Sequence, residues 1–208
     1  MWFSDAGAEE KMLDHLESLE DMGQASKAKE GTSFLDLGTG NGHLLFALRD
    51  EGWQGRAFGV DYSAKSVELA RQIARQRAQD QGGDEVENHD VQFEEWDLLK
   101  QAPGSWLGYG FDIVLDKGTF DAISLSAEED AQGRRICESY RGRVEPLLKA
   151  DGRFLITSCN WTADELRGWF EVEGGALVYE DAVKYPTFTF GGVTGQKVCT
   201  LCFKKKST

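Results

Sequence analysis

A glycine-rich turn with an acid just before it is the segment of this chain best suited to bind a ligand. A short apolar run ends in Gly-Thr-Gly-Asn-Gly, and a second apolar segment follows. This order predicts a strand, a tight turn and a helix. Glycines allow positive φ and close approach to a bound molecule, and the N–H groups at the start of the helix can face it. The residues predicted to contact the ligand here are Asp36, Gly38, Thr39, Gly40, Asn41 and Gly42.

The spacing of the glycines separates two candidate cofactors. A dinucleotide fingerprint reads G-x-G-x-x-G, whereas this chain has G-x-G-x-G with Asp36 before it, which favours S-adenosylmethionine over NAD. Asp61 ends the next apolar run, and its two carboxylate oxygens match the two ribose hydroxyls of either cofactor. Tyr62 follows it as a possible wall of the site.

A third acid, Asp97, is predicted to meet the adenine. Its carboxylate would accept a hydrogen bond from the exocyclic amine, and the flanking Trp96 and Leu98 would offer apolar faces to the ring. Taken one at a time, such acids are better explained as caps of loops. Because Asp36, Asp61, Asp97 and Asp116 all lie at ends of predicted strands, their joint placement favours a ligand site.

A second group of residues is suited to hold a methyl acceptor. Methyl transfer from a sulfonium is an in-line displacement, so the protein mainly has to place the acceptor and exclude water. A lysine acceptor has a reference pKa of about 10.4 and must lose a proton first. Burial among apolar rings lowers that pKa, whereas a carboxylate attracts the cation and raises it. The candidates are Asp116, Phe120, Asp121, Asn160, Trp161, Tyr185 and Phe190, although a place in the core explains Trp161 or Phe190 nearly as well.

Strands and helices that could position these residues alternate along the chain. Five strands are predicted at 34–37, 55–61, 91–97, 111–116 and 153–158, and strand-like segments follow at 176–179, 187–190 and 197–203. Helices are predicted over 8–22, from the glycine turn to about residue 52, and over 63–79, 133–149 and 163–170.

This alternation predicts a doubly wound α/β fold. Its sheet would be seven-stranded and mostly parallel, with helices on both faces and a C-terminal antiparallel hairpin formed by 187–190 and 197–203. At 208 residues the chain is most simply one domain, 1–208, in which 1–31 form an N-terminal helix and linker.

Composition narrows the functional classes. The net charge of −13, from 36 acids and 23 bases, argues against a nucleic-acid partner and fits a basic one, although acidity also serves solubility. With neither a membrane-spanning run nor a signal peptide, a cytoplasmic protein is expected. Cys199 and Cys202 lie three apart in an extended run, so they should face opposite sides of the sheet as packing residues. No metal site is predicted, because the histidines and cysteines lack ligand spacing.

Five strings together support a family resemblance. They are FLDLGTGNG at 34–42, GVDYS at 59–63, DKGTFDAISL at 116–125, SCNWT at 158–162 and the segment 190–204. Over nearly the whole chain these resemble the elongation factor 1-alpha lysine methyltransferases of the seven-strand, class I type. The glycine turn is shared by all class I methyltransferases, whereas DKGTFD and SCNWT are far more discriminating.

The resemblance implies an enzyme that transfers methyl groups from S-adenosylmethionine to a lysine of translation elongation factor 1-alpha and releases S-adenosylhomocysteine. The resemblance implies a cytoplasmic enzyme. A monomer with no nucleic-acid or membrane partner is expected, and Trp2 and Phe3 are further candidates for contact with the cofactor. Family members usually have further residues before that pair, so a shortened chain is expected. The acceptor side is assigned to Asp116, Phe120, Asn160 and Trp161, with Asp116 also beside the cofactor.

Alternatives stay open at this point. A class I methyltransferase could act on another protein or on a small molecule. Amide and nucleic-acid N-methyltransferases of this fold carry an Asn/Asp-Pro-Pro-aromatic motif where this chain has Asp-Lys-Gly-Thr, which argues against a DNA base or a glutamine as acceptor. An NAD-dependent oxidoreductase and an inactive cofactor-binding subunit are the alternatives from other classes.

Overall fold

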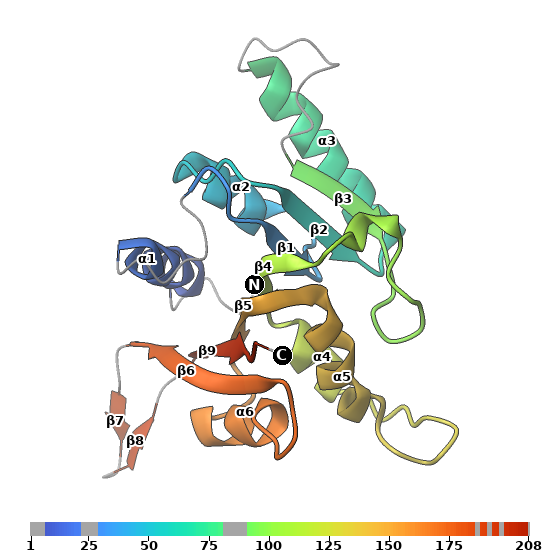
Figure 1. Ribbon diagram of the computed structural model, residues 1–208, viewed down its shortest axis with the longest axis vertical. Coiled ribbons are helices and arrows are strands. Elements are labelled where there is room, and N and C mark those ends of the chain that lie inside the picture. Colours follow the sequence, from blue (N-terminus) through green and yellow to red (C-terminus); the bar gives the residue numbers. More distant parts are fainter. Residues whose placement is uncertain are drawn as a thin grey trace.

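The computed structural model describes residues 7–21, 29–80, 91–185, 188–190, 193–195 and 198–207. Helices and strands alternate through most of the chain, as Figure 1 shows. The elements are α1 (Ala8–Asp21), β1 (Phe34–Leu37), α2 (His43–Asp50), β2 (Ala57–Asp61), α3 (Ala64–Asp80), β3 (Val91–Glu95), η2 (Ser105–Leu107), β4 (Phe111–Lys117), α4 (Thr119–Ser124), η3 (Ile136–Ser139), α5 (Tyr140–Val144), η4 (Glu145–Leu147), β5 (Leu148–Ser158), α6 (Ala163–Phe170), β6 (Leu177–Val183), β7 (Phe188–Phe190), β8 (Val193–Gly195) and β9 (Cys199–Lys205), where η denotes a 3₁₀ helix.

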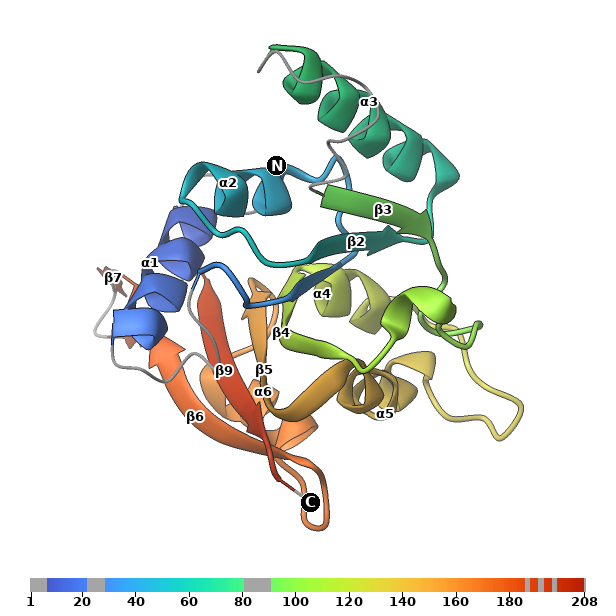
Figure 2. The same cartoon turned by 45° about the horizontal axis from the view of Figure 1, so that its top comes forward.

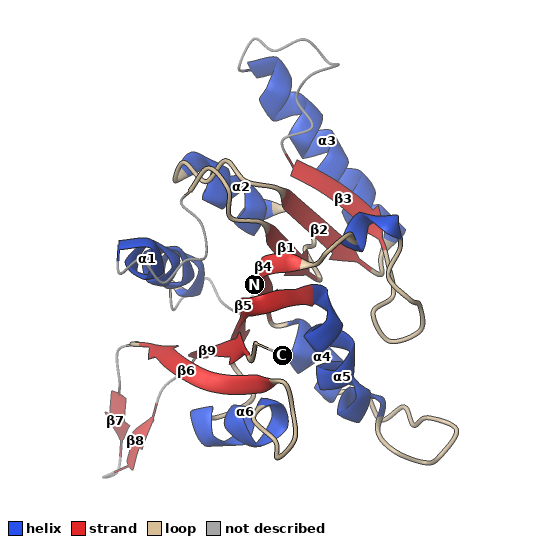
Figure 3. Ribbon diagram, viewed as in Figure 1, coloured by secondary structure: helices blue, strands red, loops and turns tan. Residues whose placement is uncertain are grey.

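The central sheet has seven strands in the order β3-β2-β1-β4-β5-β9-β6. The five strands from β3 to β5 are parallel, whereas β9 runs antiparallel to both β5 and β6. Figure 3 shows the red strands with blue helices around them. The predicted fold class is therefore confirmed: a doubly wound, mostly parallel sheet with antiparallel C-terminal strands.

Two apolar layers cover the two faces of this sheet. Because successive residues of a strand point to opposite faces, Leu35 and Leu37 pack into one layer and Phe34 into the other. The first layer joins α4, α5 and α6 to the sheet, and the second joins α1, α2 and α3 to it. Figures 1 and 2 show these two groups of helices on opposite sides of the strands.

Helix α1 matches the predicted amphipathic helix. Its Met12, Leu16 and Leu19 are buried in the same layer as α2 and α3. Full burial of such a side chain contributes roughly 1.5–3 kcal/mol, so three of them can hold the helix in place. The first turn of α1 is thereby brought next to the glycine turn.

The predicted helix over 133–149 is confirmed in part, because residues 136–147 are helical but do not form one continuous α-helix. The structure instead has three short pieces, η3, α5 and η4, and β5 begins at Leu148, five residues before the predicted strand start of 153. Gly142 lowers helix propensity in the middle of the segment, and Pro146 has no N–H to continue the ladder. The structure adds α4, a six-residue helix that is too short to show a periodic apolar pattern.

The strand pairing predicted for the closing hairpin is wrong. Strand β9 pairs with β5 and β6, while β7 pairs with β8 in a separate two-stranded sheet. The burial of β9 explains this arrangement, because Leu201 and Phe203 lie in one apolar layer and Cys202 lies in the other. A strand buried on both faces belongs inside a sheet rather than at the tip of a hairpin.

The cysteine prediction is confirmed. Cys199 packs against the layer of α4 to α6, and Cys202 lies in the opposite layer. All four cysteines are free thiols.

Among the residues that the structure describes, no group of three acidic, histidine or cysteine side chains is arranged to hold a metal ion. In the same part of the chain, no helix combines the length and apolarity needed to cross a membrane.

Candidate functional site

The glycine turn has the backbone that its sequence requires. Gly38, Gly40 and Gly42 have φ values of +66°, +57° and +81°, a region that other residues rarely adopt. A Cβ on Gly38 would lie 2.1 Å from the Thr119 hydroxyl oxygen, and one on Gly42 would lie 2.5 Å from the Phe93 ring. A Cβ on Gly40 would meet nothing within 4 Å. Two glycines are thus needed for packing, and the third faces open space where a ligand could approach.

Asp36 lies in β1 as predicted, but its side chain is buried. Burial raises the pKa of its carboxyl to about 7, and the nearby Lys117 ammonium opposes that rise only in part. A buried carboxyl of this kind can hold the turn through its own contacts, while direct contact with a cofactor stays a prediction.

Asp61 is brought to the glycine turn, as its sequence position predicted. Its Oδ2 accepts a hydrogen bond from the Gly40 N–H and its Oδ1 accepts one from the Ser63 N–H, both at 2.9 Å. Each carboxylate oxygen has a second lone pair, so these bonds leave acceptor capacity for a ribose. Tyr62 is 78% exposed beside it, which suits the wall predicted there.

The residues predicted to surround adenine are placed differently. Trp96 is buried against Trp106, and its indole N–H donates to the Ala102 carbonyl at 3.2 Å. Leu98 is buried in the same apolar layer. Both side chains thus belong to the apolar core, and their predicted contact with adenine stays a prediction. Asp97 is half-buried and caps a turn, because its Oδ1 accepts from two N–H groups that follow it, those of residues 99 and 100.

Asp116 does not line an open surface. Its carboxylate is 0% exposed and accepts hydrogen bonds from the Thr119 N–H, the Phe120 N–H and the Tyr140 hydroxyl. Burial raises the pKa of Asp116 to about 7, although these donors oppose the rise. The carboxylate caps the start of α4 from inside the protein, and the expected contact with acceptor or cofactor stays a prediction.

Phe120 is likewise a core residue rather than a wall of an acceptor pocket. It is 1% exposed, and its ring contacts the rings of Tyr140, Trp161, Trp169 and Phe170 at centroid distances of 5.1–6.1 Å. Because it is covered on several sides, it can support an acceptor site only through the rings that it packs against.

Asn160 and Trp161 remain suited to meet an acceptor. Asn160 is exposed, and Trp161 is half-buried on the loop after β5. The Trp161 indole N–H donates to the Ser124 hydroxyl oxygen at 3.0 Å, which fixes the ring above α4. Tyr185 is buried instead, with its hydroxyl 2.7 Å from that of Thr200. Among these candidates, the loop at 158–162 presents the accessible side chains.

Some of the predicted site residues lie outside the described part of the chain. Trp2 and Phe3 lie outside the described residues, as does most of the loop at 80–89. The side chain of Phe190 is also outside the described part of the chain, although β7 itself is described.

Sequence reasoning missed a contact between α1 and the glycine turn. Glu9 Oε1 lies 2.5 Å from the Nδ1 of His43, the first residue of α2, and Glu9 Oε2 lies 4.0 Å from the Nζ of Lys117. The helical spacing of Glu9 from Met12 places both near one face of α1, which is the available signal in the sequence. Glu9 thus brings a carboxylate to the ends of β1 and β4.

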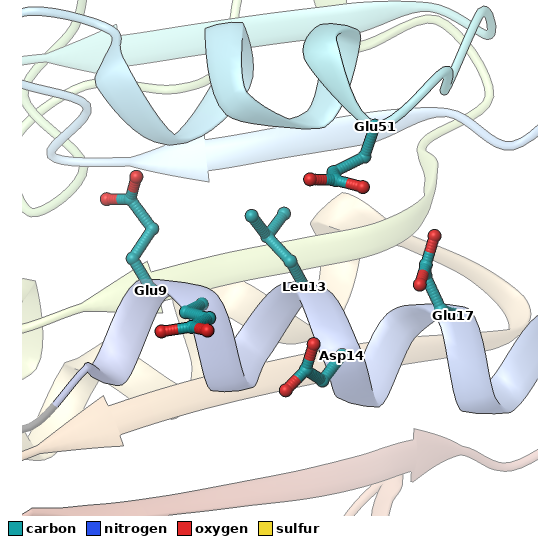
Figure 4. A pocket seen from close by; sticks show the side chains of 6 residues that line it. Glu9, Leu13, Asp14, Glu17 and Glu51 are labelled. Carbon is teal, nitrogen blue, oxygen red and sulfur yellow. The ribbon is translucent and has the colours of Figure 1, made fainter.

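A hollow of about 280 Å³ lies between α1 and α2. Figure 4 shows Glu9, Leu13 and Glu17 extending from α1 toward α2, with Glu51 approaching from the other side. A second hollow, of about 120 Å³, includes Asn41 of the glycine turn. The first is acidic and lies beside the turn rather than over it; its lining residues are Glu9, Glu10, Leu13, Asp14, Glu17 and Glu51.

Comparisons with known proteins agree with this geometry. The family model described as "Methyltransferase domain" matches residues 28–206. The chain is 44% identical over 206 residues to the protein-lysine N-methyltransferase EFM4 of Saccharomyces cerevisiae, covering 99% of this chain and 83% of that protein. It is 37% identical over 183 residues to the EEF1A lysine methyltransferase 2 of Homo sapiens, covering 88% of this chain and 69% of that protein.

A solved structure supports the fold independently. The magnesium protoporphyrin IX methyltransferase of Synechocystis PCC 6803 with bound SAM superposes with a TM-score of 0.60 at 15% identity, covering 94% of this chain and 80% of that one. At this identity the likeness concerns the arrangement of strands and helices alone.

Proposed function

The chain belongs to the methyltransferase-domain family and to the protein-lysine N-methyltransferases within it, and we propose that it methylates a lysine of translation elongation factor 1-alpha. The methyl donor is S-adenosylmethionine, and the other product is S-adenosylhomocysteine. The substrate is inferred from the relative named EEF1A lysine methyltransferase 2.

The observation that carries the proposal is the register of three neighbouring strands. Leu37 at the end of β1 is paired with Val60 of β2 on one side and with Asp116 of β4 on the other. The glycine turn, Asp61 and the turn after β4 therefore lie together at the carboxyl edge of the sheet. In doubly wound folds this edge, where the strand order reverses, is where ligands bind.

On the donor side, the residues that the structure describes are suited to bind a nucleoside sulfonium. Gly40 leaves open space beside its backbone, and Asp61 retains acceptor capacity next to it. These residues would hold the cofactor, Asp61 at the ribose and the glycine turn along its amino-acid part. When bound, S-adenosylmethionine supplies the methyl group on its sulfur.

The acceptor side is the adjoining edge, formed by the ends of β4 and β5. Exposed Asn160 can hydrogen-bond an incoming main chain or ammonium, and half-buried Trp161 offers an apolar ring. Desolvation against such a ring lowers the pKa of a lysine and favours the neutral amine that can attack. The lysine would first lose its proton to solvent. Its nitrogen would then bond to the methyl carbon as the carbon–sulfur bond breaks, and the electron pair of that bond would stay on sulfur.

The proposal extends to the setting in which the enzyme works. A partner with a basic surface suits a chain with 36 acids and 23 bases. The enzyme acts as a cytoplasmic monomer and binds neither nucleic acid nor membrane under this proposal.

Transfer of radiolabelled methyl to purified elongation factor 1-alpha tests the proposal. The wild-type chain should label a lysine that mass spectrometry can locate, and Asp61→Ala should lose the labelling. If the factor stays unlabelled while another component of a lysate is labelled, the substrate assignment is wrong. Binding of a nicotinamide cofactor but not of S-adenosylhomocysteine in calorimetry would select the oxidoreductase alternative.

A further inference from the structure

Two segments far apart in the sequence, 116–124 and 158–162, are joined by buried side chains. The Ser158 hydroxyl donates to Oδ1 of Asp121, and the Cys159 N–H donates to Oδ2 of Asp121 at 2.8 Å. Asp121 and Ser158 are each 1% exposed. Because both carboxylate oxygens accept from the start of the loop after β5, the place of that loop depends on Asp121.

Ser158 extends this connection into the loop itself. Its hydroxyl oxygen accepts hydrogen bonds from the Asn160 N–H at 3.1 Å and from the Trp161 N–H at 2.9 Å. The Trp161 indole is fixed separately by Ser124, as described above. The backbone and the ring of the loop are therefore both attached to α4.

The other end of α4 reaches the cofactor side. The Thr119 hydroxyl donates to the Leu37 carbonyl at 2.6 Å, directly before the glycine turn. The same hydroxyl oxygen occupies the space that a Cβ on Gly38 would need. Residues 116–124 thus contact the glycine turn at one end and the loop 158–162 at the other.

We propose that Asp121 and Ser158 are positioning residues that set the distance between the methyl donor and the acceptor lysine. The inference rests on the proposed function, because the loop that they hold carries Asn160 and Trp161, the side chains which an acceptor can reach. Neither Asp121 nor Ser158 needs to contact the substrate. A misplacement of about 1 Å between reacting groups can lower a rate by about 100-fold, so their effect is on alignment.

Asp112 offers a matched control in the same strand as Asp116. Its buried carboxylate accepts from the Ser33 N–H, the Ser33 hydroxyl and the Lys149 ammonium at 2.6–2.9 Å. It lies near the start of β4, at the opposite edge of the sheet from the site. Asp112→Asn therefore removes a comparable buried acceptor away from the proposed acceptor loop.

The test measures Asp121→Asn, Ser158→Ala and Asp112→Asn for thermal stability, for S-adenosylhomocysteine affinity by calorimetry, and for kcat and KM with elongation factor 1-alpha. Asp121→Asn and Ser158→Ala should each lower kcat/KM for the acceptor at least tenfold and keep the affinity within about twofold of wild type. The double variant should lose little more than either single one, because each change already disturbs the Asp121–Ser158 bond through which both residues hold the loop. Asp112→Asn should lower stability but not kcat/KM.

Other outcomes overturn the inference. An equal loss of kcat/KM in Asp112→Asn at matched stability would make the effect of Asp121→Asn merely structural. A parallel loss of S-adenosylhomocysteine affinity in Asp121→Asn, or unchanged kinetics in both Asp121→Asn and Ser158→Ala, would also overturn it. If the wild-type chain does not label the elongation factor, the proposed function has failed instead, and the two failures are thereby distinguished.

Discussion

The cofactor side and the acceptor side of the site use aspartates in different ways. Asp61 lies at the end of β2 next to exposed Tyr62 and accepts from backbone N–H groups at the glycine turn. Asp116, near the end of β4, and Asp121, in α4, are 0% and 1% exposed and accept from groups inside the protein. All three side chains are buried, Asp61 at 8% exposed, so burial alone does not separate a ligand-binding acid from an internal clamp. The neighbours differ, because Asp61 contacts Gly40, which has open space beside it.

The largest expected effect is on the cofactor side, from Gly38→Ala. The new Cβ would overlap the Thr119 hydroxyl, and its φ of +66° costs a non-glycine residue about 1–2 kcal/mol before that overlap is relieved. We expect S-adenosylhomocysteine affinity to fall by about 100-fold or more, which corresponds to about 2.7 kcal/mol. Calorimetry checks this.

Gly52→Ala is the matched control for that change. Gly52 has a φ of +87° and open space around its Cβ, and it lies just after α2, away from the turn. It should destabilise the fold modestly without changing the cofactor affinity. If both variants lose affinity alike, the packing of Gly38 against Thr119 has no special part in the site.

An intermediate effect is expected from Asp61→Asn. Asp61 accepts one hydrogen bond from the Gly40 N–H and one from the Ser63 N–H, each at a different oxygen. An asparagine has only one acceptor oxygen, so one of these two N–H groups would face the NH₂ group of its side chain instead. Leaving such a group unpaired costs about 1–3 kcal/mol, which corresponds to a loss of about 5-fold to 150-fold in S-adenosylhomocysteine affinity by calorimetry.

Asp97→Asn sharpens the same comparison. The turn cap at Asp97 uses one oxygen, Oδ1, for both backbone donors, so an asparagine can preserve it. Unchanged affinity would leave Asp97 as a cap, whereas a tenfold loss would support the predicted contact with adenine.

A separate effect, on stability rather than on cofactor affinity, is the pH dependence that the buried acids impose. Asp36 and Asp116 have folded-state pKa values raised to about 7 by burial, so the folded chain binds more protons than the unfolded chain between about pH 4 and pH 7. The free energy of unfolding should therefore decline as pH rises through that window. Asp116→Asn should reduce the decline but leave the part due to Asp36. Urea unfolding at several pH values measures it, and an unchanged slope would contradict the buried, protonatable state of Asp116.

The sequence predicts the glycine turn and the placement of Asp61 well because the signals for both are local. The glycines at 38–42 and Asp36 form one continuous stretch, and the end of β2 supplies Asp61. The period of the apolar residues and the turn-forming glycines are sufficient to predict such a segment. The predicted strands β1 to β4 and helix α6 occur within a few residues of their expected bounds for the same reason.

The acceptor side could not be predicted in this way, because long-range contacts define it. Tyr140 donates to Asp116 across 24 residues, and Ser158 donates to Asp121 across 37. Neither partner has a spacing that local patterns would reveal. The short helix α4 and the insertion of β9 between β5 and β6 likewise depend on tertiary packing. The same long-range packing covers Phe120, a candidate for the acceptor site, with the ring of Tyr140, and Trp96, a candidate for contact with adenine, with the ring of Trp106.

A crystal structure of the chain with S-adenosylhomocysteine tests the division of the site most directly. The homocysteine part should follow the turn at 38–42, the ribose hydroxyls should donate to Asp61, and the sulfur should face the loop at 158–162. Asp116 and Asp121 should keep their internal partners. A ligand bound elsewhere, or Asp121 released from Ser158 and turned toward the ligand, would contradict it.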